Sequence, residues 1–158
     1  MKDSLRTGIS FGLTSAVITT LGLMVGLHSG THSKFVVLGG ILSIAFADAF
    51  SDALGIHISE EAENVHSVMQ IWGTTLVTFL TKLVFALTFV IPVWLFSLTT
   101  AIFFSLAWGL SVLTALSFFM AKFQGKNPWK IISEHLLIAI VVIFITHWIG
   151  DLINRMGT

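Results

Sequence analysis

The sequence predicts an all-α integral membrane protein with five transmembrane helices. Of its 158 residues, 55% are hydrophobic and only 10% are charged, and the mean hydropathy is +0.95. A soluble domain carries about 25% charged residues. The apolar stretches are also long enough for membrane helices, which need about 20 residues to cross about 30 Å of hydrocarbon. We therefore expect a single domain, residues 1–158, that resides in a lipid bilayer.

Short polar or charged segments separate most of the apolar stretches. The uncharged stretch from Leu83 to Ala121 would be about 58 Å long as one helix, about twice the thickness of the hydrocarbon core, so it must break. Pro92 is the expected turn within it. Asn127 is expected to cap the last helix, with Pro128 as its first residue. The expected spans are residues 8–27, 35–58, 68–91, 93–121 and 129–153.

The basic residues indicate the orientation, because short cytoplasmic loops are enriched in Lys and Arg. With five spans, Lys34 and Arg155 fall on one side of the membrane and five other basic residues on the opposite side. We therefore expect a multi-pass protein of a prokaryotic cell membrane, with the N-terminus and the acidic segment Ser59–Ser67 in the cytoplasm. The five residues on the cytoplasmic side are Lys2, Arg6, Lys122, Lys126 and Lys130.

Several function classes are disfavoured by composition and motifs. The formal net charge is zero, so no basic excess indicates a nucleic-acid partner. The chain has no cysteine and hence no thiolate ligand or redox thiol. It also lacks the HExxH, GxSxG and phosphate-loop motifs. We therefore expect neither an enzyme nor a tightly bound cofactor.

Charged residues within the expected second helix predict a metal-binding path. Ionisable groups at membrane depth are costly and indicate function by default. Asp48 and Asp52 are four residues apart and share a helix face, where two carboxylates need a proton, a cation or water. Glu60, Glu63 and, if the helix continues, His66 extend this face toward the cytoplasm. Carboxylate and imidazole ligands suit Mn²⁺, Fe²⁺ or Zn²⁺, so these five residues are predicted metal ligands.

Other polar residues leave alternatives open. Lys82 lies in the expected third helix and can pair with Asp48, either as a permanent structural ion pair or only while no metal is bound. Ser15 and Thr19, one turn apart in the first helix, can offer hydroxyls to a passing cation or serve close helix packing. Ser51, beside Asp52 in the sequence, is also predicted to lie on the path of this cation, together with Ser15, Thr19 and Lys82.

Parts of the chain resemble the vacuolar iron transporter family. Residues Phe11–Gly26 are similar to its first-helix motif, which typically reads FG-x-x-DG followed by T-x-G-L-x-x-G. Ala53–Gly55 with Ile58 and Ser59 resembles its second-helix stretch ALGEYLS. Phe89–Pro92 and the loop Gly125–Pro128 resemble the end of its third helix and the loop before its last helix.

The resemblance implies a homodimer of five-helix subunits that moves Fe²⁺ or Mn²⁺ out of the cytoplasm, in exchange for protons, along a path between the subunits. The family's first-helix Asp and second-helix Met lie on that path, and Ser15 and Asp52 occupy these positions here. Asp48 replaces a small residue, and Ile56 replaces the Glu of ALGEY. The family's cytoplasmic metal-binding insertion is reduced to Ser59–Ser67.

These observations lead to one main hypothesis and two alternatives. The main hypothesis is a homodimeric exporter of Fe²⁺ or Mn²⁺, in which Asp48 and Asp52 bind the ion and Glu60, Glu63 and His66 recruit it. The first alternative is a non-transporting scaffold or partner subunit, in which a permanent ion pair to the lysine of the third helix neutralises Asp48. The second alternative keeps transport but makes a proton or another cation the substrate.

Overall fold

The computed structural model describes residues 2–157 of the chain, with side chains from Leu5 onward. All regular secondary structure in this part is α-helical. Five helical segments are long and apolar enough to span a membrane: α1, α2, α3 together with α4, α5 and α6. The predicted all-α fold and number of apolar spans are therefore confirmed. The helices are α1 Lys2–Thr31, α2 Lys34–Glu63, α3 Val68–Thr88, α4 Val90–Leu95, α5 Leu98–Phe123 and α6 Pro128–Met156.

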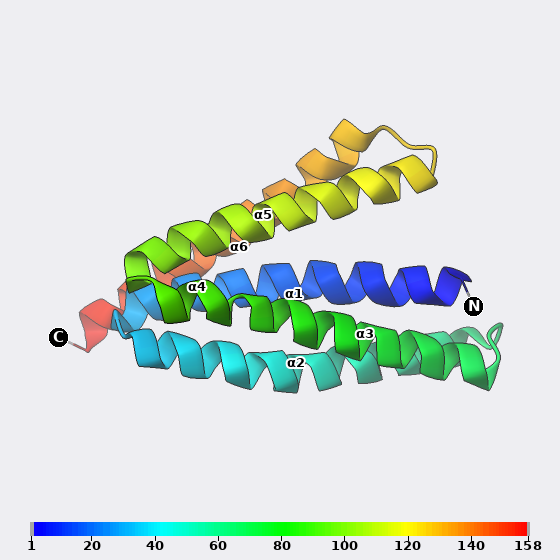
Figure 1. The fold of residues 1–158 in the computed structure, drawn as a ribbon, viewed down its shortest axis with the longest axis horizontal. Helices are drawn as coiled ribbons and strands as arrows, with labels where there is room; N and C mark the ends of the chain where they lie inside the picture. Colours follow the sequence, from blue (N-terminus) through cyan, green and yellow to red (C-terminus); the bar gives the residue numbers. More distant parts are fainter. Residues whose placement is uncertain (1, 158) are drawn as a thin grey trace.

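Helix α1 is the central helix and contacts α2, α3, α5 and α6 (Figure 1). The spans alternate in direction, so the N-terminus lies at the same end as the α2–α3 and α5–α6 turns, and the C-terminus lies at the opposite end. The charge asymmetry expected between the two ends follows this arrangement. The N-terminal end carries Arg6, Lys122, Lys126 and Lys130, and the opposite end carries Lys34 and Arg155.

Glycines allow α1 to approach its neighbours closely. A Cβ atom on Gly12 would lie 2.8 Å from the backbone oxygen of Thr78 on α3. A Cβ atom on Gly150 of α6 would overlap the carbonyl oxygen of Gly26 on α1. Small residues bring transmembrane helices together by permitting such backbone contact. The α1–α3 and α1–α6 crossings therefore depend on these positions.

The turn expected at Pro92 is wrong. Helix α3 ends at Thr88, Phe89 leads into the short helix α4, and the chain reverses only at Phe96–Ser97. A proline lacks the N–H that would bond the carbonyl four residues earlier, and its ring clashes with that carbonyl, which here belongs to Thr88. Pro92 then fits into the first turn of α4, where backbone N–H groups have no intrahelical partner. The proline bends the third span without ending it.

The sequence also predicted where α2 ends and where α6 begins. Helix α2 continues to Glu63, beyond the expected end at residue 58, and closes at Asn64 in the left-handed conformation (φ 52°). His66 consequently lies in the loop and does not continue the α2 face. The start of α6 is as predicted: the Asn127 side chain accepts a hydrogen bond from the backbone N–H two residues later at 3.0 Å, and Pro128 is the first helical residue.

Candidate functional site

A buried lysine joins three helices at the centre of the bundle. The ammonium nitrogen (Nζ) of Lys82 on α3 lies 2.5 Å from Oδ2 of Asp48 and also contacts Oδ2 of Asp52, both on α2. It donates a further hydrogen bond to Oγ of Ser15 on α1, at 2.7 Å. Two of the three ammonium N–H donors form hydrogen bonds, to Ser15 and Asp52, whereas Asp48 contributes an ion pair without a hydrogen bond. The predicted contact between Lys82 and Asp48 is present, and it includes a second carboxylate and a hydroxyl.

The helices place this group at mid-depth of the spans. Asp48 is at the midpoint of α2, and Lys82 is close to the midpoint of the span Val68–Leu95. Gly12 allows α1 to lie against the backbone of α3, one turn before Ser15. A charged side chain at the bilayer centre costs about 2.5–3.5 kcal/mol on insertion scales. Mutual pairing offsets part of that cost for these three charges.

The site is open on its acidic side. The side chain of Lys82 is 1% exposed, whereas those of Asp48 and Asp52 are 24% and 19% exposed. With all three groups ionised, the site carries one excess negative charge. Its oxygen ligands, two carboxylates and the hydroxyl of Ser15, are of the kind that hard and borderline metal ions prefer. The excess negative charge and these oxygen atoms favour a cation on the carboxylate side of the site.

A row of small residues lies next to the two carboxylates on the exposed face of α2, and we call it the small-residue stripe. Its members recur at every fourth position, and all of them are exposed. A Cβ atom added to the glycine of the stripe would meet no atom within 4 Å. Small residues at this spacing let a second helix approach closely. The stripe consists of Ser43, Ala47, Ser51, Gly55 and Ser59.

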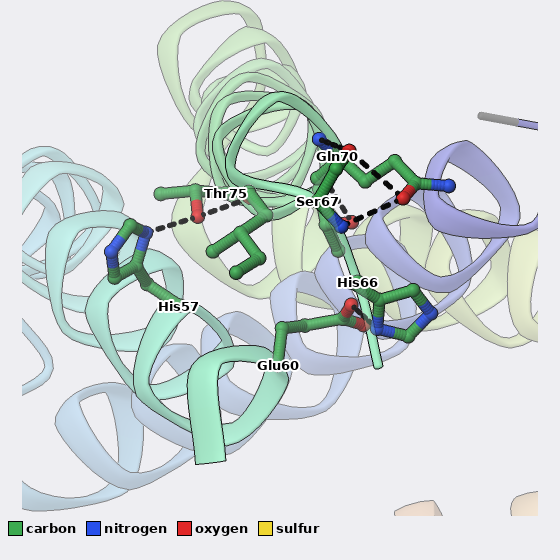
Figure 2. Close-up of polar contacts among 8 residues, drawn as sticks. His57, Glu60, His66, Ser67, Gln70 and Thr75 are labelled. Atoms are coloured by element: carbon green, nitrogen blue, oxygen red, sulfur yellow. Dashed lines mark hydrogen bonds and ion pairs between the residues drawn. The ribbon is translucent and has the colours of Figure 1, made fainter. Parts of the chain in front are cut away.

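A second polar pair lies at the end of the bundle that contains the N-terminus. Glu60 is buried near the end of α2, and the following loop returns His66 to it, with Nδ1 2.8 Å from Oε2 (Figure 2). Glu63 is exposed. Glu60 is eight residues from Asp52, about 12 Å along the helix, and Ile56 lies between them. The five predicted ligands therefore do not form one site. Asp48 and Asp52 lie at the central site, Glu60 pairs with His66, and Glu63 is exposed.

Neither the central site nor the Glu60–His66 pair offers many metal ligands. Among the described residues, no three His, Asp or Glu side chains converge into a metal-binding group. A metal at the central site would thus have two carboxylates and Ser15 Oγ as ligands from this chain. The Thr19 hydroxyl donates to the backbone oxygen of Ser15 at 2.8 Å. Ser51 faces outward on the small-residue stripe.

Three histidine–hydroxyl contacts between helices were not predicted. Each links a histidine to a Ser or Thr on a neighbouring helix, and in two of them the hydroxyl also donates to a carbonyl one turn earlier. The partners are 18 or 118 residues apart, so no local pattern signals them. The pairs are His57 with Thr75, His135 with Ser117, and His147 with Ser29.

No family model, curated protein or solved structure matches this chain. The resemblance to vacuolar iron transporters therefore depends only on the residues quoted above. Transport, its substrate and the dimer that the resemblance implies are proposals.

Proposed function

We propose that this chain is a homodimeric membrane transporter that moves Fe²⁺ or Mn²⁺ out of the cytoplasm in exchange for protons. One observation carries the proposal: two partly exposed carboxylates, Asp48 and Asp52, converge on the buried ammonium of Lys82 at mid-depth of the spans. In this proposal, the lysine is a tethered cation that offsets one of the two negative charges while no metal is bound.

The charges support exchange of the ammonium for a metal ion. The three ionised groups leave one negative charge in excess, and a dication would neutralise two carboxylates completely. Because a metal needs deprotonated carboxylates, protonation of Asp48 or Asp52 lowers the affinity for metal. Proton entry from the far side would therefore release the metal, and this coupling makes the process an exchange.

The small-residue stripe supports a dimer in which a second copy of the chain covers Asp48 and Asp52. Asp48 and Asp52 lie at the edge of α2 beside the stripe, and their partial exposure to hydrocarbon in a monomer would be costly. Two α2 helices packed through their stripes would cover these carboxylates. They would also place both acidic pairs at one interface, where ligands from two copies supplement the few that one copy offers.

Glu60 and His66 fit a role in cation recruitment. In the proposed orientation they lie at the cytoplasmic end of α2, and Glu60 is on the same side of α2 as Asp52. A carboxylate and an imidazole at that place can hold a divalent ion briefly before it moves toward the central site. Glu63 adds negative charge at the exposed end of the helix.

Metal flux in proteoliposomes tests the proposal. We expect Asp48→Asn and Asp52→Asn each to lower the rate of Mn²⁺ uptake at least about tenfold, because each removes a charged ligand. Glu134→Gln is the matched control: it neutralises an exposed carboxyl on α6, far from the site in sequence, and should transport normally. Undiminished Mn²⁺ flux through both aspartate variants would rule out this site as the metal path.

One observation favours a second candidate function. The buried Lys82 ammonium forms ion pairs with both carboxylates and hydrogen bonds with Asp52 and Ser15, as expected of a permanent structural ion pair in a scaffold or partner subunit. Such a scaffold requires no metal affinity at Asp48 and Asp52. Lys82→Met separates the two functions, because only a metal-binding site should gain stability from Mn²⁺ after the lysine is removed.

A further inference from the structure

A groove of about 440 Å³ runs along the outer face of α2 and α3. His57, in this groove, is nine residues from Asp48, which at about 100° per residue places the two on opposite sides of α2. The groove is therefore separate from the central site, and an inference about it does not depend on the proposed transport. Its walls include Phe50, Leu54, His57, Trp72, Leu76 and Phe79.

His57 offers a hydrogen-bond acceptor to a ligand in the groove. His57 Nδ1 lies 2.9 Å from Oγ1 of Thr75, and that hydroxyl donates its single proton to the backbone oxygen of Ile71 at 2.8 Å. Nδ1 must therefore be the N–H donor to Thr75, which leaves Nε2 as an acceptor in the neutral ring. Figure 2 shows the other ring nitrogen directed away from Thr75. A ligand that donates a hydrogen bond fits this position.

The polar end of the groove lies near one end of the third span. Thr75 is seven residues from the start of α3, about 10 Å along the helix. The Trp72 ring meets the imidazole of His57 edge-on with centroids 4.7 Å apart, and tryptophans favour the membrane–water boundary. Toward the middle of the span, the rings of Phe50 and Phe79 pack with centroids 4.6 Å apart. The groove thus has one polar end and an apolar body.

We propose that this groove binds a neutral membrane lipid with a hydroxyl headgroup, such as a diacylglycerol. The hydroxyl donates to Nε2 of His57, and an acyl chain follows the aromatic walls toward Phe50. The volume lies in the range of small-molecule sites, about 300–1,000 Å³. A second copy fits less well, because Phe50 and Trp72 project from this face and the small-residue stripe follows another face of α2.

A comparison within the same molecule supports the choice of groove. A wider groove of about 640 Å³ lies between α5 and α6, with no histidine in its lining. Acyl chains can fill it, but it lacks the imidazole acceptor that would select one headgroup. His135 on α6 has the same kind of hydroxyl contact as His57 but belongs to neither groove lining, so it provides a matched control.

Native mass spectrometry of the delipidated full chain in detergent tests the proposal. Dioleoylglycerol should bind about fivefold more tightly than its 3-acetyl ester, which has the same chains but no hydroxyl donor, because one hydrogen bond distinguishes them. His57→Phe should remove this preference, and His135→Phe should retain it. If His57→Phe does not fold, Leu54→Trp fills the groove without changing the imidazole and should abolish binding.

Three results would overturn the proposal. The first is equal binding of the two lipids to the unmutated protein, which would indicate nonspecific lipid contact. The second is a preference that survives His57→Phe or Leu54→Trp. The third is efficient disulfide formation by a Trp72→Cys variant of this cysteine-free chain, since Trp72 lines the groove from α3, away from the stripe, and a disulfide there would place a second copy in the groove.

Discussion

At the residue scale, the least expected contacts belong to Lys82. It is among the largest fully buried side chains, yet it carries a charge at mid-depth of an apolar bundle. Its ammonium donates hydrogen bonds to Ser15 on α1 and Asp52 on α2 and forms an ion pair with Asp48, so a single residue links three helices. Removing one partner of a buried ion pair is strongly destabilising, because the remaining charges are left without compensation. Substitution of Lys82 is therefore the most informative test of the site.

Replacing Lys82 by methionine distinguishes transport from a structural role. We expect Lys82→Met to lower the free energy of unfolding by about 3–5 kcal/mol without metal, because Asp48 and Asp52 lose their cation. If the site binds metal, Mn²⁺ at 100 times its dissociation constant should return about 2.7 kcal/mol. Thermal unfolding with and without Mn²⁺ measures both effects.

The control for this variant is Lys34→Met, which removes a lysine that, within the described part of the chain, donates to the backbone oxygens of Trp94 and Phe96. Its melting temperature should not gain a metal dependence. If Mn²⁺ raises the melting temperature of Lys82→Met no more than that of the unmutated protein, the ion pair is structural and the scaffold function is favoured.

At the element scale, the position of α1 depends on close crossings with α3 and α6. Gly12 admits the backbone of α3 near Lys82, and Gly150 admits α6 near Gly26. These crossings bring the helices close enough for short side chains to meet, as Ser15 meets Lys82 and Ser29 meets His147. The contacts between helices therefore depend on residues that have no side chains of their own.

Two glycine-to-alanine variants should change stability in opposite directions. Gly150→Ala places a methyl group against the Gly26 carbonyl and should lower the free energy of unfolding by about 1–3 kcal/mol. Gly39→Ala adds the same group where no atom lies within 4 Å, so only the helix preference of alanine remains, about 0.5–1 kcal/mol in favour of folding. Unfolding titrations in mixed micelles measure both. Equal effects of the two variants would contradict the close crossing of α1 and α6.

At the scale of the whole molecule, the face formed by the small-residue stripe is the surface best suited to a second copy. Bulky apolar side chains are common on the other lipid-facing surfaces, whereas the stripe presents only small side chains over several turns of α2. Asp48 and Asp52 lie at its edge, so an interface here would close the central site. The proposed dimer and the proposed metal binding at Asp48 and Asp52 therefore depend on each other.

Cysteine cross-linking in bilayers tests this interface, since the chain has no cysteine of its own. We expect Ser51→Cys to form a disulfide between two copies, because the stripe brings the two α2 backbones close together. Phe144→Cys, at an exposed position of α6, is the control and should remain monomeric. Equal cross-linking of the two variants would mean that α2 is not the interface.

The features of the site that could be predicted follow from short stretches of sequence, whereas those that could not be predicted are contacts between residues far apart in the sequence. Asp48 and Asp52 could be found from the sequence because charges are rare in apolar stretches and a four-residue spacing defines a helix face. Lys82 was a candidate partner for the same reason. The hydroxyl of Ser15 was predicted only as one of several on the path, because its lysine partner is 67 residues away and no local pattern encodes that contact.

The path of the backbone around Pro92 was also predictable only in its local features. Its local effect was predictable, since a proline interrupts the helical hydrogen bonds four residues before it, and α3 does end at Thr88. The position of the reversal was not predictable in this way. The reversal occurs at Phe96–Ser97, where Lys34 from α2 holds the backbone oxygens of Trp94 and Phe96.

By itself, the sequence determined that this chain forms five apolar helices with acidic residues at mid-depth, because hydropathy, helix period and proline geometry act over short stretches. Only the tertiary structure decided which polar groups meet. Two aspartates meet one lysine and a serine, Glu60 meets His66, and three other histidines each meet a hydroxyl on a neighbouring helix. The physical reason is that such contacts depend on how closely helices cross, and residues distant in the sequence determine those distances.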